Sequence, residues 1–203
     1  MEILSIKKNL HGNTGRLIAV LALAVVMLFV LDPCPVAEAA SFKPDQVKAA
    51  FIYNLTNFVN LPEKTGSSSR SAYVIAVLGN RNIARYLQMI TKGESRNGRP
   101  FVIKYADTPD ELDRCHILFV DHTFEEKVPE LLEQLSGNCL LTVGESKEFL
   151  RAGGMVGLVP RGKRIQIVIN LDAAEASGIS FNSKLLRVAS IERAGSGSRR
   201  REP

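Results

Sequence analysis

The chain has 203 residues, 45% of them hydrophobic, and a formal net charge of +5. This length and apolar content are sufficient for a domain with a real core. The positive charge is scattered, and its densest cluster, 199–201, lies in a Gly/Ser-rich tail that we expect to be disordered over 194–203. Basic residues interleaved with aromatics on a structured face are not found, so we expect no nucleic-acid partner.

The N-terminus has the pattern of a secretory signal peptide. Three basic residues precede an uncharged apolar run at 17–31, and Ala37-Glu38-Ala39 offers a small-x-small cleavage site. The run is shorter than the roughly 20 residues of a spanning helix, which leaves an uncleaved anchor as the weaker alternative. Cys34 is a poor lipidation site because Asp32-Pro33 precedes it instead of small residues. We therefore predict a cleaved signal peptide at 1–39 and an exported single domain at 40–193.

The exported part alternates predicted helices and strands. Segment 41–59 predicts an amphipathic helix, because apolar residues recur at helical spacing and Pro62 follows its end. A polar, Ser/Gly-rich loop is expected at 63–71. The later elements are expected to be a strand at 73–78, a helix at 82–91, strands at 101–105 and 115–120, helices at 125–135 and 146–151 around a strand at 139–143, strands at 155–159 and 164–170, and helices at 171–177 and 183–191.

The stretch Cys115–Asp121 organises this pattern. It is short, apolar and rich in β-formers, which is typical of a strand covered on both faces in a parallel sheet. With the helix and strand that follow, it completes a β-α-β unit. The two strands around the turn 160–162 predict an antiparallel hairpin at the sheet edge. We therefore predict an α/β fold, a three-layer-like sandwich with a mostly parallel sheet of about six strands and helices on both faces.

Two cysteines remain after export, Cys115 and Cys139, each at the start of its predicted strand. If these strands are neighbours, the cysteines start about 5 Å apart, within disulfide reach. In an oxidising compartment such a bridge would stabilise the domain by roughly 3 kcal/mol. The alternative is two buried, unpaired thiols.

Catalytic signatures are missing from the sequence. It contains no nucleophile elbow, phosphate-binding loop or dinucleotide-binding glycine pattern. His116 lies inside an apolar strand, which favours a core or edge role. Asp121 and His122 have no further ligand at a spacing typical of metal sites. We predict no enzymatic activity, no cofactor and no metal.

One edge of the sheet is a candidate ligand site. Ligands of parallel sheets bind beyond the carboxyl ends of the strands, where helix N-termini offer free N–H groups. Asn80, His122 and Glu145 are expected at that edge. They would either form a small-molecule pocket or belong to ordinary capped turns.

Several segments along the exported part resemble one known family in its own order. They are Lys48-Ala49-Ala50-Phe51-Ile52-Tyr53-Asn54 with Phe58-Val59 and Pro62, Val77-Leu78-Gly79, Cys115-His116-Ile117-Leu118-Phe119, Leu141-Thr142-Val143-Gly144-Glu145, Gly153-Gly154-Met155, Ile169-Asn170, and Ser183-Lys184-Leu185-Leu186 with Ala189. Together these segments are similar to the YfiR-like family of periplasmic regulatory proteins.

The resemblance implies a periplasmic regulator without catalytic activity. Such proteins bind the periplasmic part of an inner-membrane diguanylate cyclase (YfiN-like) and repress it, which limits cyclic-di-GMP signalling and biofilm formation. An outer-membrane lipoprotein is a second partner in this scheme, and a homodimer is also left open. Other members serve sensor kinases or outer-membrane receptors, so a small-molecule-sensing module is the alternative function.

Two departures from the family pattern affect these expectations. Leu61 stands where members usually carry a tryptophan, and 140–203 lacks the second cysteine pair of the cyclase-repressing type. Only Cys115 and Cys139 could then form a redox-sensitive bridge.

For the partner-binding surface we predict exposed apolar side chains on the edge hairpin, together with the last helix. The predicted hairpin residues are Met155, Leu158, Ile165 and Ile167. The alternative for each is a place in the core.

Overall fold

The computed structural model describes residues 43–62, 71–134 and 139–193. The chain divides into two compact units, Met1–Ser41 and Phe42–Pro203, and every described residue belongs to the second. The predicted signal peptide, most of the predicted loop at 63–71 and the predicted tail lie outside the described residues. Within these described ranges, no helix has both the length and the apolar character needed to cross a membrane.

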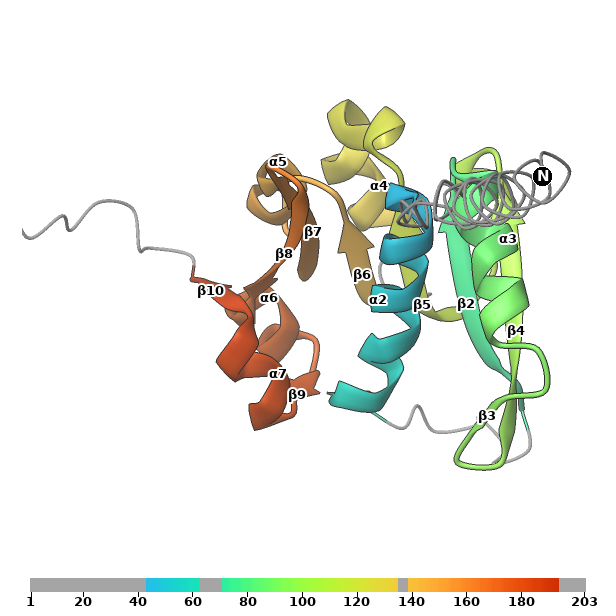
Figure 1. Ribbon diagram of the computed structural model, residues 1–203. Helices are drawn as coiled ribbons and strands as arrows, with labels where there is room; N and C mark the ends of the chain where they lie inside the picture. Colours follow the sequence, from blue (N-terminus) through green and yellow to red (C-terminus); the bar gives the residue numbers. More distant parts are fainter. Residues whose placement is uncertain (1–42, 63–70, 135–138, 194–203) are drawn as a thin grey trace, which may run out of the picture. The chain divides into compact units, whose positions relative to one another are not determined.

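An eight-stranded sheet forms the middle layer of the domain, in the order β10-β8-β7-β6-β5-β2-β4-β3 (Figure 1). Its strands are β2 Tyr73–Leu78, β3 Ser95–Arg96, β4 Arg99–Ala106, β5 Cys115–Val120, β6 Cys139–Gly144, β7 Val156–Arg161, β8 Arg164–Asn170 and β10 Ser190–Glu192. Neighbours run parallel, except in the antiparallel pairs β7–β8 and β3–β4. The predicted α/β class with a mostly parallel sheet is confirmed.

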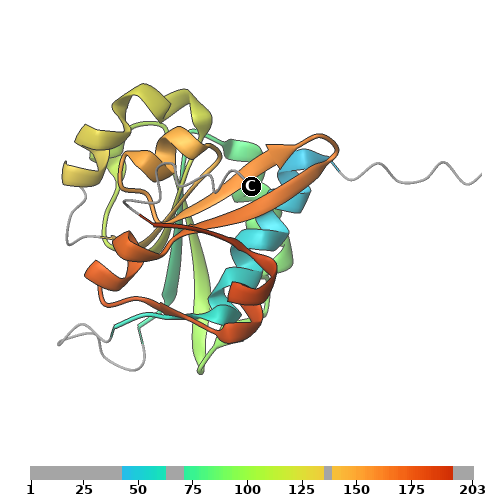
Figure 2. The same cartoon turned by 90° about the vertical axis from the view of Figure 1, so that its left-hand side faces the viewer.

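Helices cover both faces of this sheet (Figure 2). They are α2 Pro44–Phe58, α3 Arg81–Ile90, α4 Val128–Gln134, α5 Lys147–Arg151, α6 Leu171–Ala176 and α7 Ser183–Val188, with 3₁₀ turns η1 Pro109–Glu111 and η2 His122–Lys127. Buried side chains of α2, α3, α6 and α7 join one core, and those of α4 and α5 join a second core. A two-stranded antiparallel pair, β1 Val59–Asn60 and β9 Ser180–Phe181, connects the end of α2 to the segment before α7.

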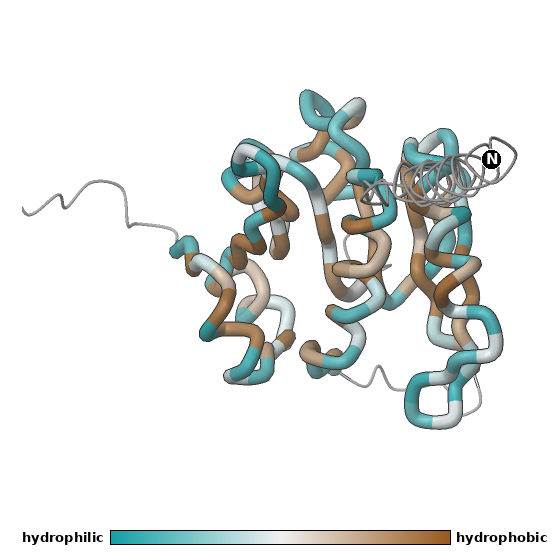
Figure 3. Tube along the Cα trace, in the orientation of Figure 1, coloured by the Kyte–Doolittle hydropathy of each residue, from teal (hydrophilic) through white to brown (hydrophobic). Residues whose placement is uncertain are grey.

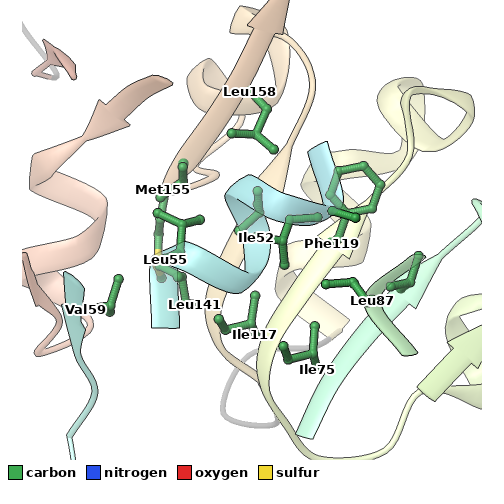
Figure 4. Close-up of a cluster of buried hydrophobic side chains, with 14 of the residues drawn as sticks. Ile52, Leu55, Val59, Ile75, Leu87, Ile117, Phe119, Leu141, Met155 and Leu158 are labelled. Atoms are coloured by element: carbon green, nitrogen blue, oxygen red, sulfur yellow. The ribbon is translucent and has the colours of Figure 1, made fainter. Parts of the chain in front are cut away.

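The central strand β5 shows why the sheet has two cores. Ile117 and Phe119 point into the first core, whereas Leu118 and Val120 point into the second. All four are at most 2% exposed, and successive side chains of a strand alternate between its faces. Figure 4 shows Ile117 and Phe119 among the side chains from α2 and the neighbouring strands. The hydrophobic colouring of Figure 3 runs along the strands and the helix sides that cover them.

Two short strands extend the six that the sequence predicts. β3 lies beyond β4 and β10 lies beyond β8, so the β7–β8 hairpin is one strand in from the edge. The predicted helix 183–191 is shorter than expected, because α7 ends at Val188 and the next residues pair with β8 as β10. Pairing with β10 satisfies backbone groups of β8 that an edge position would leave open.

Candidate functional site

The carboxyl ends of β2, β5 and β6 meet at one edge of the sheet. These three strands are parallel neighbours, so the residues that follow them lie side by side. Asn80 follows β2, Asp121 and His122 follow β5, and Glu145 follows β6. The structure therefore brings the three predicted residues Asn80, His122 and Glu145 into one group, and Asp121 connects them.

Asn80 and Asp121 are held by each other and by the turns they begin. The Asn80 amide donates from Nδ2 to Asp121 Oδ2 at 2.9 Å, while Asn80 Oδ1 accepts the N–H of Ile83 at 3.1 Å. Asp121 Oδ1 accepts the N–H of Thr123 at 3.1 Å. Both side chains cap the helical turn that follows, so the capped-turn interpretation holds for this half of the group.

Hydrogen bonding keeps Asp121 ionised although its side chain is only 4% exposed. Burial acts to raise its pKa, but the hydrogen bonds from Thr123 and Asn80 outweigh burial, and the net pKa lies below the usual value. A buried carboxylate with this support carries a fixed negative charge at the edge of the sheet.

Gly79 allows the turn after β2 to approach η2. Its φ is +85°, a region that side chains rarely adopt. A Cβ placed on Gly79 would lie 2.7 Å from Phe124 Cε2 and 3.1 Å from Asp121 Cβ. Glycine is therefore needed for the close packing that places Asn80 beside Asp121.

His122 and Glu145 form the other half of the group. His122 Nδ1 lies 3.1 Å from Asp121 Oδ1 and 3.5 Å from Glu145 Oε2, so one ring nitrogen faces two carboxylates. The His122 side chain is 66% exposed and that of Glu145 is 8% exposed. The group is therefore open to solvent on the histidine side and closed on the glutamate side.

Lys48 of α2 completes the site. Its Nζ lies 2.8 Å from Glu145 Oε1 and 3.9 Å from Asp45 Oδ1, and its side chain is 12% exposed. No role at this site was predicted for Lys48 from the sequence. The helical spacing does indicate that Lys48 faces the core, because it shares the i, i+4, i+7 face of α2 with the buried Ile52 and Leu55.

The site carries more negative than positive charge. Asp45 and Glu145 share the ammonium of Lys48, Asp121 adds a third carboxylate, and His122 is the other basic side chain in the group. Burial raises the pKa of Glu145, Lys48 opposes this effect, and the charge of Asp121 adds to it. This arrangement is suited to binding a cation.

The chain matches a known protein family over most of its length. The YfiR/HmsC-like family matches residues 45–190, most of the chain. The chain belongs to this family. The YfiR/HmsC-like proteins are periplasmic regulators that act through other proteins, and the match contains every residue of the polar site.

Similarity to solved structures is weaker. A conserved domain protein from Vibrio cholerae O1 biovar El Tor has 14% identity and a TM-score of 0.49, over 73% of this chain and 60% of that one. The ABC domain from Streptococcus pneumonia in complex with L-Trp has 13% identity and a TM-score of 0.49, over 74% of this chain and 60% of that one. This chain thus spans less than two thirds of either. No curated protein matches it in sequence.

In this family member, His116 lies apart from the polar site at the start of β5. Its Nδ1 accepts the N–H of Val74 at 3.0 Å, its Nε2 lies 2.8 Å from Arg99 Nη2, and its ring stacks on Tyr73 at 4.6 Å. Burial and the Arg99 charge lower its pKa. Because Nδ1 accepts a hydrogen bond it carries no proton, so the ring is neutral, as expected for a histidine with a structural role.

The predicted cysteine geometry is present in the backbone. Cys115 is the register partner of Cys139 on the neighbouring strand. Cys115 is 4% exposed and is disulfide-bonded. That the bridge joins Cys115 to Cys139 and responds to redox state stays a prediction.

The hairpin residues predicted for partner binding are not an exposed surface. Leu158 is 0% exposed and Met155 is 9% exposed, and Ile165 and Ile167 are partly buried against the same core. The expectation of exposure is wrong for Met155 and Leu158, because their side chains point to the face that α2 covers. Among the described residues, Val188 of α7 and Ile191 of β10 are exposed instead, at 74% and 42%.

Proposed function

We propose that this protein is a non-enzymatic periplasmic regulator that binds the periplasmic domain of a membrane-embedded diguanylate cyclase of the YfiN kind and represses it. The family match over 45–190 carries the proposal, because it includes almost the whole sheet with its covering helices. Repression would follow from differential affinity: the regulator binds the inactive conformation of the cyclase more tightly and so increases its population.

The proposed docking region is the β10 surface, formed by Val188 and Ile191. These apolar side chains are 74% and 42% exposed and stand three residues apart in the sequence. Strand β10 ends the described sheet on that side, so its outer edge can accept backbone hydrogen bonds. An apolar pair beside an open strand edge supports a protein partner more than a small ligand.

Substitution of the β10 surface tests the proposal. Purified wild-type protein and the variants Val188→Glu and Ile191→Glu would be titrated against the periplasmic domain of the cyclase, with cyclic-di-GMP measured in cells carrying both genes. Each variant should weaken binding about tenfold or more and raise cyclic-di-GMP. Met89→Glu is the matched control, because Met89 is 66% exposed on α3 near the opposite end of the sheet.

The outcome is clear in either direction. Folded variants that release the cyclase, with Met89→Glu still bound, support the β10 surface. Wild-type protein that neither binds a cyclase domain nor changes cyclic-di-GMP would rule out the proposed function. Loss of repression by Met89→Glu alone would move the docking region to α3.

A second candidate is a small-molecule-sensing module that serves a sensor kinase or an outer-membrane receptor. The convergence of Asn80, His122 and Glu145 around Asp121 favours it. A thermal-shift screen against nucleotides and amino acids separates the two candidates, because a sensor is stabilised by its ligand without any partner protein.

A further inference from the structure

Three side chains with metal-binding atoms converge at the carboxyl edge of the sheet. One ligand atom each from Asp121, His122 and Glu145 lies within 4.8 Å of the other two. The distances from His122 Nδ1 are 3.1 Å to Asp121 Oδ1 and 3.5 Å to Glu145 Oε2. A tetrahedral zinc ion with bonds of about 2.1 Å separates its ligand atoms by about 3.4 Å. The two distances from His122 Nδ1 to the carboxylate oxygens are therefore already close to the spacing of zinc ligands.

The imidazole of His122 cannot by itself satisfy both carboxylates. Its Nδ1 carries at most one proton, yet it faces one oxygen of Asp121 and one of Glu145. A metal ion bound by Nδ1 would accept all three ligands at once. The opposing charge nearby is small, because Lys48 alone is shared by Glu145 and Asp45.

The surroundings hold the ligand atoms in place. Asn80 and the N–H of Thr123 orient the Asp121 carboxylate. Lys48 donates to Oε1 of Glu145, which leaves Oε2 directed toward His122. Hydrogen bonds of this kind orient metal ligands and increase metal affinity. The His122 side chain is 66% exposed, so an ion can enter from solvent and water can take the fourth position.

We propose that Asp121, His122 and Glu145 bind a divalent transition-metal ion, of which Zn²⁺ fits best. One imidazole nitrogen with two carboxylate oxygens suits zinc, whereas magnesium and calcium prefer oxygen ligands alone. The proposal rests on the second candidate function in one respect: it names a metal ion as the ligand that such a sensing module would detect. Ion binding by itself needs no partner and no cyclase. The spacing of residues in the sequence did not predict a metal site, because Glu145 follows a different strand from Asp121 and His122.

Zinc binding to the purified protein tests the proposal. Chelator-treated protein would be titrated with Zn²⁺ by calorimetry, and with Co²⁺ while its visible absorption reports the coordination geometry. We expect one ion per chain and no competition from Mg²⁺ or Ca²⁺. His122→Ala and Glu145→Gln should each weaken Zn²⁺ binding by at least about tenfold. Glu148→Gln is the control, because Glu148 is a 62% exposed carboxylate outside the group, paired with Arg151.

Specific results would overturn the site. They are wild-type protein without saturable Zn²⁺ binding up to millimolar concentration, or His122→Ala with unchanged affinity. His122→Ala decides even if Glu145→Gln unfolds the protein, because the His122 side chain is largely exposed. Partner binding would be measured separately in chelator, so failure of the ion site is distinguishable from failure of the proposed function.

Discussion

The ion pair between α2 and the end of β6 offers a sharp test of the described packing. Lys48 Nζ lies 2.8 Å from Glu145 Oε1, with side chains that are 12% and 8% exposed. Replacing Lys48 with methionine keeps most of the length of the side chain but leaves Glu145 as a buried charge without its main partner. Breaking a buried pair typically costs about 3–5 kcal/mol. Because Lys48 is not fully buried, we expect a loss of about 3 kcal/mol.

The assay is urea unfolding followed by circular dichroism, with the free energy of unfolding obtained by linear extrapolation. An exposed pair in the same part of the chain provides the control. Arg151 Nη1 lies 2.6 Å from Glu148 Oε1, but these side chains are 65% and 62% exposed. Arg151→Met should therefore cost at most about 1 kcal/mol.

A double variant separates the ion pair from simple loss of packing. If the cost of Lys48→Met comes from the uncompensated Glu145 charge, adding Glu145→Leu should recover much of the stability, and the interaction energy should exceed about 1 kcal/mol. Equal costs for Lys48→Met and Arg151→Met, or additive effects of the two substitutions at the buried pair, would refute the reasoning.

Three further predictions concern other parts of the domain. Burial and Arg99 hold the pKa of His116 below 6.5. The unfolded chain therefore binds the proton more readily, and the stability of the fold falls as the pH drops below about 6.5. The urea midpoint of the wild type should be lower at about pH 5 than at about pH 7.5, and this difference should be smaller in His116→Gln. Reduction of the Cys115 disulfide should cost roughly 3 kcal/mol, whereas Cys115→Ser should be insensitive to reductant in the same unfolding assay. Gly154→Ala should cost about 1–3 kcal/mol by calorimetry, since the added Cβ would overlap the buried Phe149 ring, and an unchanged melting temperature would contradict that packing.

The sheet could be predicted because its central strands are unambiguous. The apolar run of β5 has no alternation, which indicates burial on both faces, and the structure buries both. The shortest strands could not be predicted. β3 has two residues and β10 has three, too few to show a period, and their pairing depends on which strand edge the fold leaves open.

The candidate site was predicted in part for a related reason. Its place follows from the order of strands and turns, which the sequence contains, and Asn80, His122 and Glu145 do converge there. The contribution of Lys48 depends on how α2 crosses the sheet, a tertiary fact without a local signal. The same crossing explains the error at the hairpin, because α2 and its core cover the side chains of Met155 and Leu158.

The polar site and the β10 surface are connected by one short helix. Ser146, next to Glu145, caps α5 by accepting the N–H of Phe149 at 2.9 Å. Near the other end of α5, the Leu150 carbonyl accepts the Asn170 amide at 3.0 Å. Asn170 is the last residue of β8, the strand that pairs with β10. We hypothesise that α5 couples a ligand at Glu145 to the β10 surface, and a change of partner affinity on Zn²⁺ binding would be the evidence, because a row of contacts alone does not establish coupling.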